Sequence, residues 1–426
     1  MTTKLTTPDS VLLVFYYRKT ARYAFNVLTA ALEKKGLLKQ ITLAFPPNKE
    51  KLLDIINNNG AKFKKIVVAW SFYSPDFETI KQELQFIHSH TTSNHVIHLA
   101  GGVHATAVPL EVLATGFNFV AVGEGEQTIC EFMNAMLCDK PVNTLQGINS
   151  FDRGGKYIQN KKGAVVDLDA FPACPTGLRK FGPIEITRGC IYACRFCQTP
   201  HINKARFRHR SIERIIETVK IMVQAGLRDY RFITPTALSY GSSDESVNFK
   251  ALEQLLQTVR AEIGPQRRLF YGTFPSEVRP EHVTERVLAL LKQYVDNDNL
   301  IIGAQSGSQS VLDLCRRGHS VESILDAVTL CVKYNFKPNV DLIFGLPGET
   351  AADVNATLEL ARNLIDMGAR IHNHTFMPLP GTPFRSSAAG SLTPQTQKKL
   401  LEITAQGQAY GNWEKQMRIA KQLADK

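Results

Sequence analysis

The amino-acid sequence predicts an α/β protein built from two consecutive series of alternating strands and helices. Short apolar runs of β type alternate with segments of helical periodicity, and the alternation resumes after a stretch rich in glycine and proline. The 426 residues are enough for two or three domains. Strands that alternate with helices form parallel sheets, and such sheets bind ligands at the carboxyl ends of their strands.

The first series occupies residues 1–140. Its expected strands are 11–17 ("VLLVFYY"), 65–72, 95–102 and the beginning of 117–126. The first of the helices between them ends at Gly36, and the last, "QTICEFMNAMLC", closes the series. Polar or glycine-rich turns follow three of the strands and are expected at one edge of the sheet.

The second series follows a linker, residues 141–180, which carries eight glycines and prolines and is expected to contain one hairpin. Residues 181–390 then contain six strand-like runs, from "IEIT" to "IHNHTFMPLPG", with helices between them. Six βα units predict a complete or partial barrel with its site at the carboxyl ends of the strands. Residues 391–426 are polar and are expected to form a helical tail.

Composition indicates a globular protein of a reducing compartment. Hydrophobic residues make up 44% and charged residues 21%, and no run of eighteen apolar residues predicts a membrane span. The N-terminus lacks the pattern of a signal peptide, so we expect a cytoplasmic protein with no membrane partner. The net charge is +11, and part of the positive charge lies in Lys204–Arg210. This charge indicates either a binding partner that is anionic, such as a nucleic acid, a cofactor or an acidic peptide, or a solvated basic surface.

Three cysteines in "GCIYACRFCQTPH" predict a metal centre at Cys190, Cys194 and Cys197. Eight cysteines in this long chain are too sparse for a disulfide scaffold, and a tight cluster in a reducing compartment indicates metal or redox chemistry. Three thiolates on one short loop fit an iron–sulfur cluster, in which one iron keeps an open position for a substrate. The alternative is three buried or zinc-bound cysteines.

This pattern resembles the radical S-adenosylmethionine (SAM) superfamily over about Ile184–Phe384, with Phe196 as the aromatic residue before the last cysteine. The resemblance implies that the three cysteines bind a 4Fe–4S cluster whose open iron chelates the amino and carboxylate groups of SAM. It also implies reduction by a flavodoxin or ferredoxin. The segments 300–320, 341–350 and 376–384 are similar to barrel segments of cobalamin-binding radical enzymes and of methylthiotransferases. The expected barrel is therefore a partial (β/α)6 TIM-type barrel.

Five barrel residues are candidates for SAM contacts on this resemblance. Gln305 and Ser306 end a strand and are expected to hydrogen-bond a ribose or a carboxylate, and Arg317 to pair with the SAM carboxylate. Gly345 lets the backbone approach a flat adenine. Thr234 stands where the family often has a short glycine-rich motif that meets the SAM amine, although this chain lacks that motif. No general acid or base is predicted.

The segment "LAGGVHATAVPLEVLATGFNFVAVGEGE" resembles the second half of a Rossmann-like cobalamin-binding domain that precedes a radical SAM domain. On this resemblance the candidate cobalamin contacts flank the nucleotide tail of the corrinoid and are Ser71, Gly101, Gly102, Gly123 and Gly125. The Asp-x-His-x-x-Gly motif is absent after the first strand, so that loop offers no histidine as the lower cobalt ligand.

Three functions remain open. The first is a cobalamin-dependent radical methyltransferase that methylates an unactivated carbon through a 5′-deoxyadenosyl radical. The second is a methylthiotransferase acting on tRNA or protein, although the N-terminal unit lacks that family's three cluster-binding cysteines. The third is a non-catalytic cobalamin-binding protein. The substrate, which is a small molecule, a peptide or an RNA, is not predicted.

Overall fold

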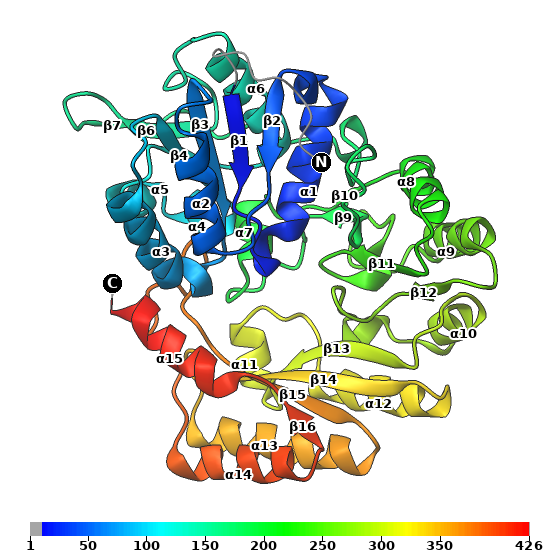
Figure 1. Ribbon diagram of the computed structural model, residues 1–426. Helices are drawn as coiled ribbons and strands as arrows, with labels where there is room; N and C mark the ends of the chain where they lie inside the picture. The colour runs from blue at the N-terminus through cyan, green and yellow to red at the C-terminus, as the bar shows by residue number, and fades with distance from the viewer. Residues whose placement is uncertain (1–10, 426) are drawn as a thin grey trace. The chain divides into compact units, whose positions relative to one another are not determined.

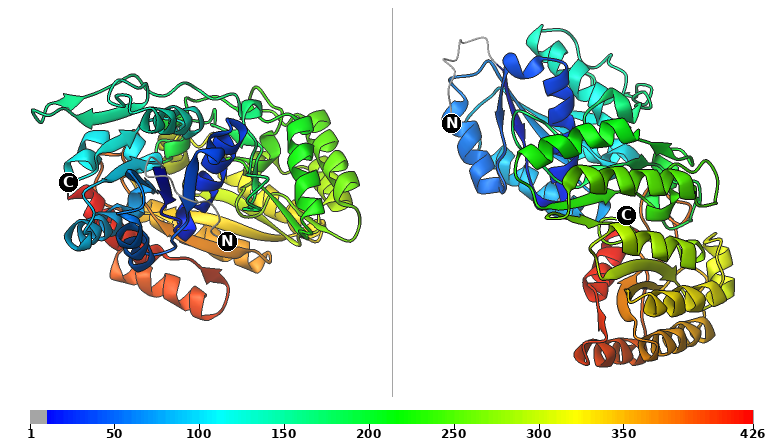
Figure 2. Two further views of the ribbon diagram at one scale, coloured as in Figure 1. Left: turned by 45° about the horizontal axis from the view of Figure 1, so that its top comes forward. Right: turned by 90° about the vertical axis from the view of Figure 1, so that its right-hand side faces the viewer.

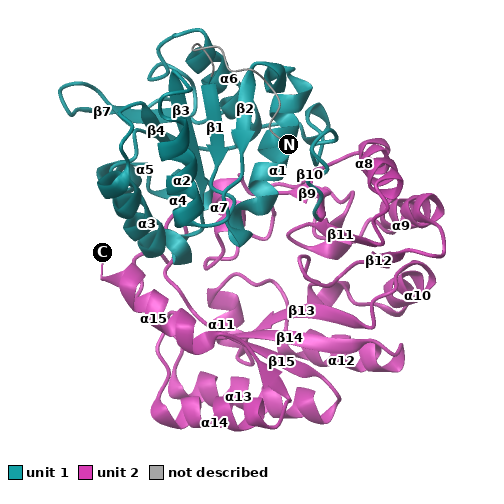
Figure 3. Cartoon of the chain, in the orientation of Figure 1, with its two compact units in different colours: residues 1–182 teal, residues 183–426 magenta. Residues whose placement is uncertain are grey.

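The computed structural model describes residues 11–425 (Figure 1). The prediction that no signal peptide is present rests partly on residues 1–10, which lie outside the described residues. The chain divides into two compact units, residues 1–182 and residues 183–426 (Figure 3). Within residues 11–425, no helix combines the length and hydropathy that crossing a membrane requires.

The first unit contains a seven-stranded sheet with the order β2-β1-β3-β4-β5-β6-β7. The strands are β1 (Val11–Phe15), β2 (Ile41–Ala44), β3 (Lys65–Ser71), β4 (Val96–Gly101), β5 (Phe119–Ala121), β6 (Ile148–Phe151) and β7 (Tyr157–Ile158). The helices are α1 (Arg22–Lys34), α2 (Lys49–Asn59), α3 (Phe77–His90), α4 (Val103–Ala107), α5 (Pro109–Ala114) and α6 (Gly125–Leu137). Strands β1 to β5 run parallel to one another, whereas β6 and β7 add antiparallel strands at one edge of the sheet.

Helices cover both faces of this sheet (Figures 1 and 2). Every residue of β1 is buried, and successive side chains point to opposite faces. Leu13 packs with Phe25 of α1, whereas Leu12 and Val14 pack with Leu52 of α2. The strand order β2-β1-β3-β4-β5 is that of a doubly wound sheet, so the carboxyl ends of β1 and β3 border the crevice where such folds bind ligands.

The glycine-rich stretch 141–180 belongs to the first unit. Its hairpin, β6 and β7, extends the main sheet because β6 pairs with β5 at Val120–Asn149 and Ala121–Ile148. Ile148, Asn149 and Ser150 are buried there. The sequence predicts the hairpin but not its place in the sheet, which depends on this long-range pairing.

Within residues 183–425, the second unit contains seven parallel strands and two short antiparallel strands that flank the cysteine loop. Its strands are β8 (Ile184–Glu185), β9 (Thr187–Arg188), β10 (Arg208–His209), β11 (Asp229–Ile233), β12 (Arg268–Phe270), β13 (Asn299–Gln305), β14 (Lys337–Phe344), β15 (Arg370–Thr375) and β16 (Ala409–Tyr410). Its helices are α7 (Gln198–Ile202), α8 (Ile212–Gln224), α9 (Phe249–Ile263), α10 (Glu285–Tyr294), α11 (Gln309–Leu314), α12 (Val321–Lys333), α13 (Ala351–Asp366), α14 (Pro394–Ala405) and α15 (Trp413–Ala424).

The parallel strands β8, β11, β12, β13, β14 and β15 follow one another in space as they do in sequence. These strands form two sheets, β12-β11-β8 and β13-β14-β15-β16, which are the two halves of the barrel. Val278 connects the halves, because its N–H donates to the Ile301 carbonyl at 2.7 Å and its carbonyl accepts from the N–H of Gly303 at 3.0 Å. The predicted α/β class and the partial barrel of six βα units are confirmed. The C-terminal segment carries the helices α14 and α15, and it also adds β16 to the sheet beside β15.

Candidate functional site

The cysteine loop leaves β9 and is held by backbone contacts. Gly189 has φ +82°, and a Cβ atom there would lie 2.2 Å from the Arg206 carbonyl oxygen, so this close approach requires glycine. The N–H of Arg195 donates to the Cys315 carbonyl at 3.0 Å, and the N–H of Cys197 donates to the Cys194 carbonyl at 3.1 Å. Cys197 then caps the short helix α7.

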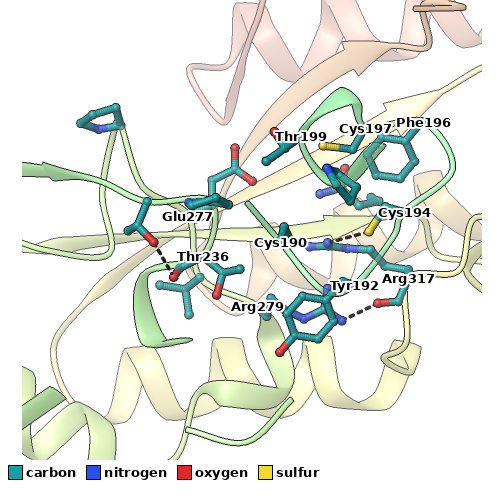
Figure 4. A pocket seen from close by; sticks show the side chains of 16 residues that line it. Cys190, Tyr192, Cys194, Phe196, Cys197, Thr199, Thr236, Glu277, Arg279 and Arg317 are labelled. Atoms are coloured by element: carbon teal, nitrogen blue, oxygen red, sulfur yellow. Dashed lines mark hydrogen bonds between the residues drawn. The ribbon is translucent and has the colours of Figure 1, made fainter. Parts of the chain in front are cut away.

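The three cysteines open onto one cavity of about 270 Å³ at the carboxyl ends of the barrel strands (Figure 4). Its wall combines the cysteine loop, the turn after β11, the segment between β12 and β13, the end of β13 and Arg317. The lining residues are Cys190, Tyr192, Cys194, Phe196, Cys197, Thr199, Pro200, Thr234, Pro235, Thr236, Pro275, Glu277, Val278, Arg279, Gln305 and Arg317.

The thiols need a positive partner to ionise in this wall. Burial, together with the charges of Cys194 and Cys197, raises the pKa of Cys190 to about 11. Burial also raises the pKa of Cys197. Three soft sulfur donors around one cavity fit an iron–sulfur cluster, because bound iron stabilises the thiolate form and leaves the rest of the cavity for a ligand.

Arg317 is the cation nearest to this sulfur set. Its Nη1 lies 3.6 Å from the Sγ of Cys194, and its Nη2 donates to the Gly303 carbonyl at 2.7 Å. A Cβ atom at Gly303 would lie 2.6 Å from Arg317 Nη2, 2.8 Å from Gln305 Nε2 and 3.4 Å from Glu277 Oε2. The missing side chain of Gly303 therefore lets an arginine, an amide and a carboxyl group gather at one point.

Glu277 is a cavity residue that the sequence reasoning missed. Burial and the charge of Asp341 raise the pKa of its carboxyl to about 7, although the charge of Arg317 acts in the opposite direction. Its segment, "TFPSEVRP", joins two strands and has no periodicity that marks a site. The available signal was that Glu277 is the first charged residue after the expected strand "RLFYGTF", at the edge where such barrels hold their sites.

Tyr192 and Arg279, also missed, stiffen the wall below the cysteines. The guanidinium carbon of Arg279 lies 3.5 Å from the centre of the Tyr192 ring. The hydroxyl of Tyr192 lies 3.0 Å from Nε2 of His282, and Arg279 also donates to the backbone carbonyl of Arg317. These contacts fix the two arginines relative to the cysteine loop (Figure 4).

Seven of the predicted barrel residues line this cavity, and two do not. Those that line it are Cys190, Cys194, Cys197, Phe196, Thr234, Gln305 and Arg317. The Ser306 hydroxyl lies 3.2 Å from Thr357 Oγ1 and accepts from the N–H of Ser308, so it holds a turn. A Cβ atom at Gly345 would lie 2.8 Å from Gly390 Cα, so this glycine serves a backbone packing contact.

The candidate residues of the first unit lie at the carboxyl edge of its sheet. Ser71 and Gly101 are direct neighbours across β3 and β4. Gly102 has φ +92°, and a Cβ atom there would lie 3.0 Å from the backbone of Phe72, whereas one at Gly101 would meet nothing closer than 3.8 Å. A Cβ atom at Gly101 would therefore make only ordinary van der Waals contacts, whereas Gly102 serves the turn into α4.

The other two glycines of the first unit lie at the entry to α6. Gly123 has φ +103° and donates its N–H to Thr106 Oγ1 at 3.2 Å. Gly125 begins α6, and a Cβ atom there would lie 2.8 Å from the side chain of Leu28. Gly123 thus permits the positive φ of the turn before α6, and Gly125 allows α6 to pack closely on α1.

Residues 184–361 match the sequence model of the Radical SAM superfamily. The tRNA-2-methylthio-N(6)-dimethylallyladenosine synthase of Moorella thermoacetica is 30% identical over 59% of this chain and 53% of its own length. A putative methylthiotransferase of Methanocaldococcus jannaschii is 27% identical over 68% of this chain and 63% of its own length. The chain spans about half the length of the first of these relatives.

Solved structures share the fold over both units. The radical SAM methyltransferase TsrM of Kitasatospora setae, solved with cobalamin and a [4Fe-4S] cluster, covers 90% of this chain and 75% of its own with a TM-score of 0.70 and 17% identity. The cobalamin-dependent radical enzyme OxsB covers 83% of this chain and 52% of its own with a TM-score of 0.61 and 16% identity. The predicted resemblance to this group is confirmed at the level of fold, and the radical SAM family uses a 4Fe–4S cluster and SAM.

Proposed function

We propose that this protein is a cobalamin-dependent radical SAM methyltransferase that methylates an unactivated carbon, because residues 184–361 match the sequence model of the Radical SAM superfamily. The observation that carries this proposal is the pairing of two folds in one chain. A doubly wound sheet with two glycines at the carboxyl end of β4 precedes the radical SAM barrel. TsrM and OxsB share this arrangement over 90% and 83% of the chain.

The methylthiotransferase alternative is favoured by sequence relatives and opposed by the first unit. The synthase of Moorella thermoacetica and the putative methylthiotransferase of Methanocaldococcus jannaschii match 59% and 68% of this chain. The first unit offers three cysteines, Cys130, Cys138 and Cys174, of which Cys130 and Cys174 are buried and Cys138 is exposed. Cys130 and Cys138 lie eight residues apart, within and at the end of α6, so they lack the close spacing of the three cysteines in the loop.

In the proposed reaction the cluster and SAM supply a 5′-deoxyadenosyl radical, and cobalamin supplies the methyl group. Cys190, Cys194 and Cys197 would hold the cluster. Arg317 and Glu277 present opposite charges to one cavity, which suits the carboxylate and the ammonium group of the methionine part of SAM. Among the described residues, Arg317 Nε is buried without a hydrogen-bond partner and is available to that carboxylate.

The remaining cavity residues would orient SAM rather than react. Gln305 and Thr234 present an amide and a hydroxyl group to the cavity, although the Thr234 hydroxyl donates to the Thr236 carbonyl at 2.9 Å. Phe196 and Pro275 supply apolar wall. Radical SAM enzymes need an electron donor, and we propose a flavodoxin or ferredoxin for this role.

The proposal predicts corrinoid-dependent consumption of SAM without knowledge of the substrate. Full-length protein with its cluster, a reductant and hydroxocobalamin should form S-adenosylhomocysteine, because a methyltransferase of this class recharges the corrinoid from SAM. Gly101→Ala should behave as the wild type, since its Cβ makes only ordinary van der Waals contacts, whereas Gly101→Leu should block the nucleotide tail and lower corrinoid binding at least about 10-fold. Equilibrium dialysis and chromatography of the products measure both effects.

Two results of this experiment would count against a methyltransferase. One is S-adenosylhomocysteine formation that is the same with and without corrinoid. The other is equal corrinoid affinity in Gly101→Leu and Gly101→Ala, which would place the nucleotide tail elsewhere. Once a substrate is found, a product mass gain of one methylthio unit instead of one methylene unit would establish the methylthiotransferase alternative.

A further inference from the structure

Three metal-ligating side chains converge on neighbouring strands of the barrel, outside the residues that line the cysteine cavity. Asp341 lies on β14, and His372 and His374 lie on β15 beside it (Figure 1). Asp341 and His372 are direct neighbours in the parallel pairing, and His374 follows two residues later on the same face. His372 Nδ1 lies 3.0 Å from Asp341 Oδ1, and His374 Nε2 lies 3.1 Å from His372 Nδ1 and 4.0 Å from Asp341 Oδ1.

These three side chains lie on the same face of the sheet as the position above Gly303 where the side chains of Arg317, Gln305 and Glu277 meet. The pairing places Gly303, Asp341, His372 and Tyr410 in one row across four strands. Glu277, which lines the cysteine cavity, lies close enough to Asp341 and His372 for their charges to act on it. The three converging side chains therefore lie near the wall of the cavity proposed to hold SAM.

Hydrogen bonds alone do not satisfy all of the contacts among these three side chains. The Oε1 of Gln416 accepts from the N–H of Thr375 at 2.9 Å, so its amide NH₂ faces Nδ1 of His374 at 3.0 Å. His374 must then carry its proton on Nε2 and donate to His372. Nδ1 of His372 then accepts from His374 and has no proton for Asp341 Oδ1, so two electron-pair donors face each other at 3.0 Å.

A bound cation removes this conflict, because all three atoms then act as electron-pair donors. Donor atoms held at about 2.1 Å from one ion lie about 3.0–3.4 Å apart at octahedral or tetrahedral angles. Two of the three separations are 3.0 and 3.1 Å, and the third, 4.0 Å, needs only a small ring rotation. Two imidazoles and one carboxylate form a donor set that binds Zn²⁺ or Fe²⁺ and leaves positions open.

The surroundings also suit a metal centre. The Tyr410 ring stacks on His372 with centroids 4.4 Å apart and an interplanar angle of 6°, which restricts rotation of the imidazole. The side chains of His372 and His374 remain 27% and 26% exposed, whereas that of Asp341 is 8% exposed. The buried carboxylate and the partly open imidazoles leave room for a further ligand.

We propose that Asp341, His372 and His374 form a second metal site, which binds one divalent transition-metal ion with an open coordination position. If the protein is the radical enzyme proposed above, the open position anchors a lone-pair group of the substrate, such as a carboxylate, an amine or a thiolate, near the SAM cavity. Metal binding itself requires neither SAM nor a corrinoid.

The test uses full-length, cluster-containing protein and Zn²⁺ as the probe. Anaerobic equilibrium dialysis followed by elemental analysis should give one zinc per chain in addition to the cluster iron. His372→Ala and His374→Ala should weaken zinc binding at least about 100-fold, because each removes a ligand. His90→Ala, an exposed histidine of the first unit, is the matched control and should bind as the wild type does.

Gln416 provides a second test that keeps all three ligands. A metal on His374 Nε2 moves the ring proton to Nδ1, where the present amide group of Gln416 offers a donor. In Gln416→Glu, one carboxylate oxygen can accept from the Thr375 N–H and the other from His374 Nδ1. This variant should bind zinc about 10-fold more tightly than the wild type, and Gln416→Leu, which offers no acceptor to Nδ1, should bind it less tightly than Gln416→Glu.

The outcomes separate this site from other sources of metal binding. Iron bound beyond the cluster and lost in His374→Ala supports the site with Fe²⁺ as its natural ion. Wild-type protein that binds no zinc while its cluster is intact overturns the proposal, as does zinc binding that persists in the double variant of His372 and His374. Because the assay contains no SAM or corrinoid, failure of the methyltransferase proposal leaves these results unchanged.

Discussion

Replacing Cys194 by alanine is expected to abolish the visible absorption of the iron–sulfur cluster and to reduce SAM cleavage to background. Cys194 is buried, lines the cavity and lies 3.6 Å from Arg317 Nη1. Without its thiolate only two cysteines of the loop remain, which are too few to hold a cubane cluster against loss of iron. Absorption spectroscopy, iron and sulfide analysis, and chromatography of 5′-deoxyadenosine measure the effect.

Cys138→Ala is the matched control for this change. It also removes one thiol, but Cys138 is exposed at the end of α6 in the first unit. The control should retain the absorption, the iron content and SAM cleavage of the wild type. Retention of a full cluster by Cys194→Ala, with circular dichroism unchanged in both variants, would show that the cluster lies elsewhere.

Arg317→Ala is expected to weaken SAM binding by about 1.5–3 kcal/mol, which corresponds to about 10- to 100-fold in affinity. Arg317 is buried, and it is the cation that lies against the Cys194 sulfur in the cavity wall. Its Nε has no hydrogen-bond partner among residues 11–425, so a SAM carboxylate would supply one. Equilibrium dialysis with labelled SAM measures the change.

Arg316→Ala is a control with the same loss of charge one residue earlier, at an exposed position. It should bind SAM as the wild type does. Iron analysis of both variants checks that the cluster is intact, because Arg317 also contacts a cluster cysteine. Equal SAM affinity in Arg317→Ala and Arg316→Ala, with full iron content, would remove Arg317 from the SAM site.

The local spacing of the cysteines carries most of what the sequence could predict about the candidate site. Three thiols within eight residues must lie near one another, whatever the rest of the chain does. Gln305 and Arg317 could be assigned because they follow an apolar strand, and barrels of this kind gather their site residues at strand ends. Alternation of strands and helices predicted the class of both sheets in the same way.

Other features depend on pairings between distant segments. Ser306 ends the same strand as Gln305, but its hydroxyl contacts Thr357, fifty-one residues later, and so stays out of the cavity. The cluster of Asp341 and His372 exists because β14 and β15 pair in one particular register. A shift of one residue in that register would send these side chains to opposite faces, and sequence alone does not fix it.

Glu277 illustrates a different limit. It lies in the connection between β12 and β13, where no periodic pattern predicts which side chain turns inward. Its place in the wall depends on the contact of Val278 with β13 and on the absence of a side chain at Gly303. Both features are visible only when the two halves of the barrel are assembled.

The central claim is that one chain combines a radical SAM cluster with a bound corrinoid. Its most direct measurement is the iron, sulfide and corrinoid content of one anaerobically purified sample after reconstitution with iron, sulfide and hydroxocobalamin and removal of unbound cofactor. We expect one corrinoid per chain and about four cluster irons with about four sulfides. About eight irons and eight sulfides per chain with no retained corrinoid would contradict the account and establish a two-cluster methylthiotransferase instead.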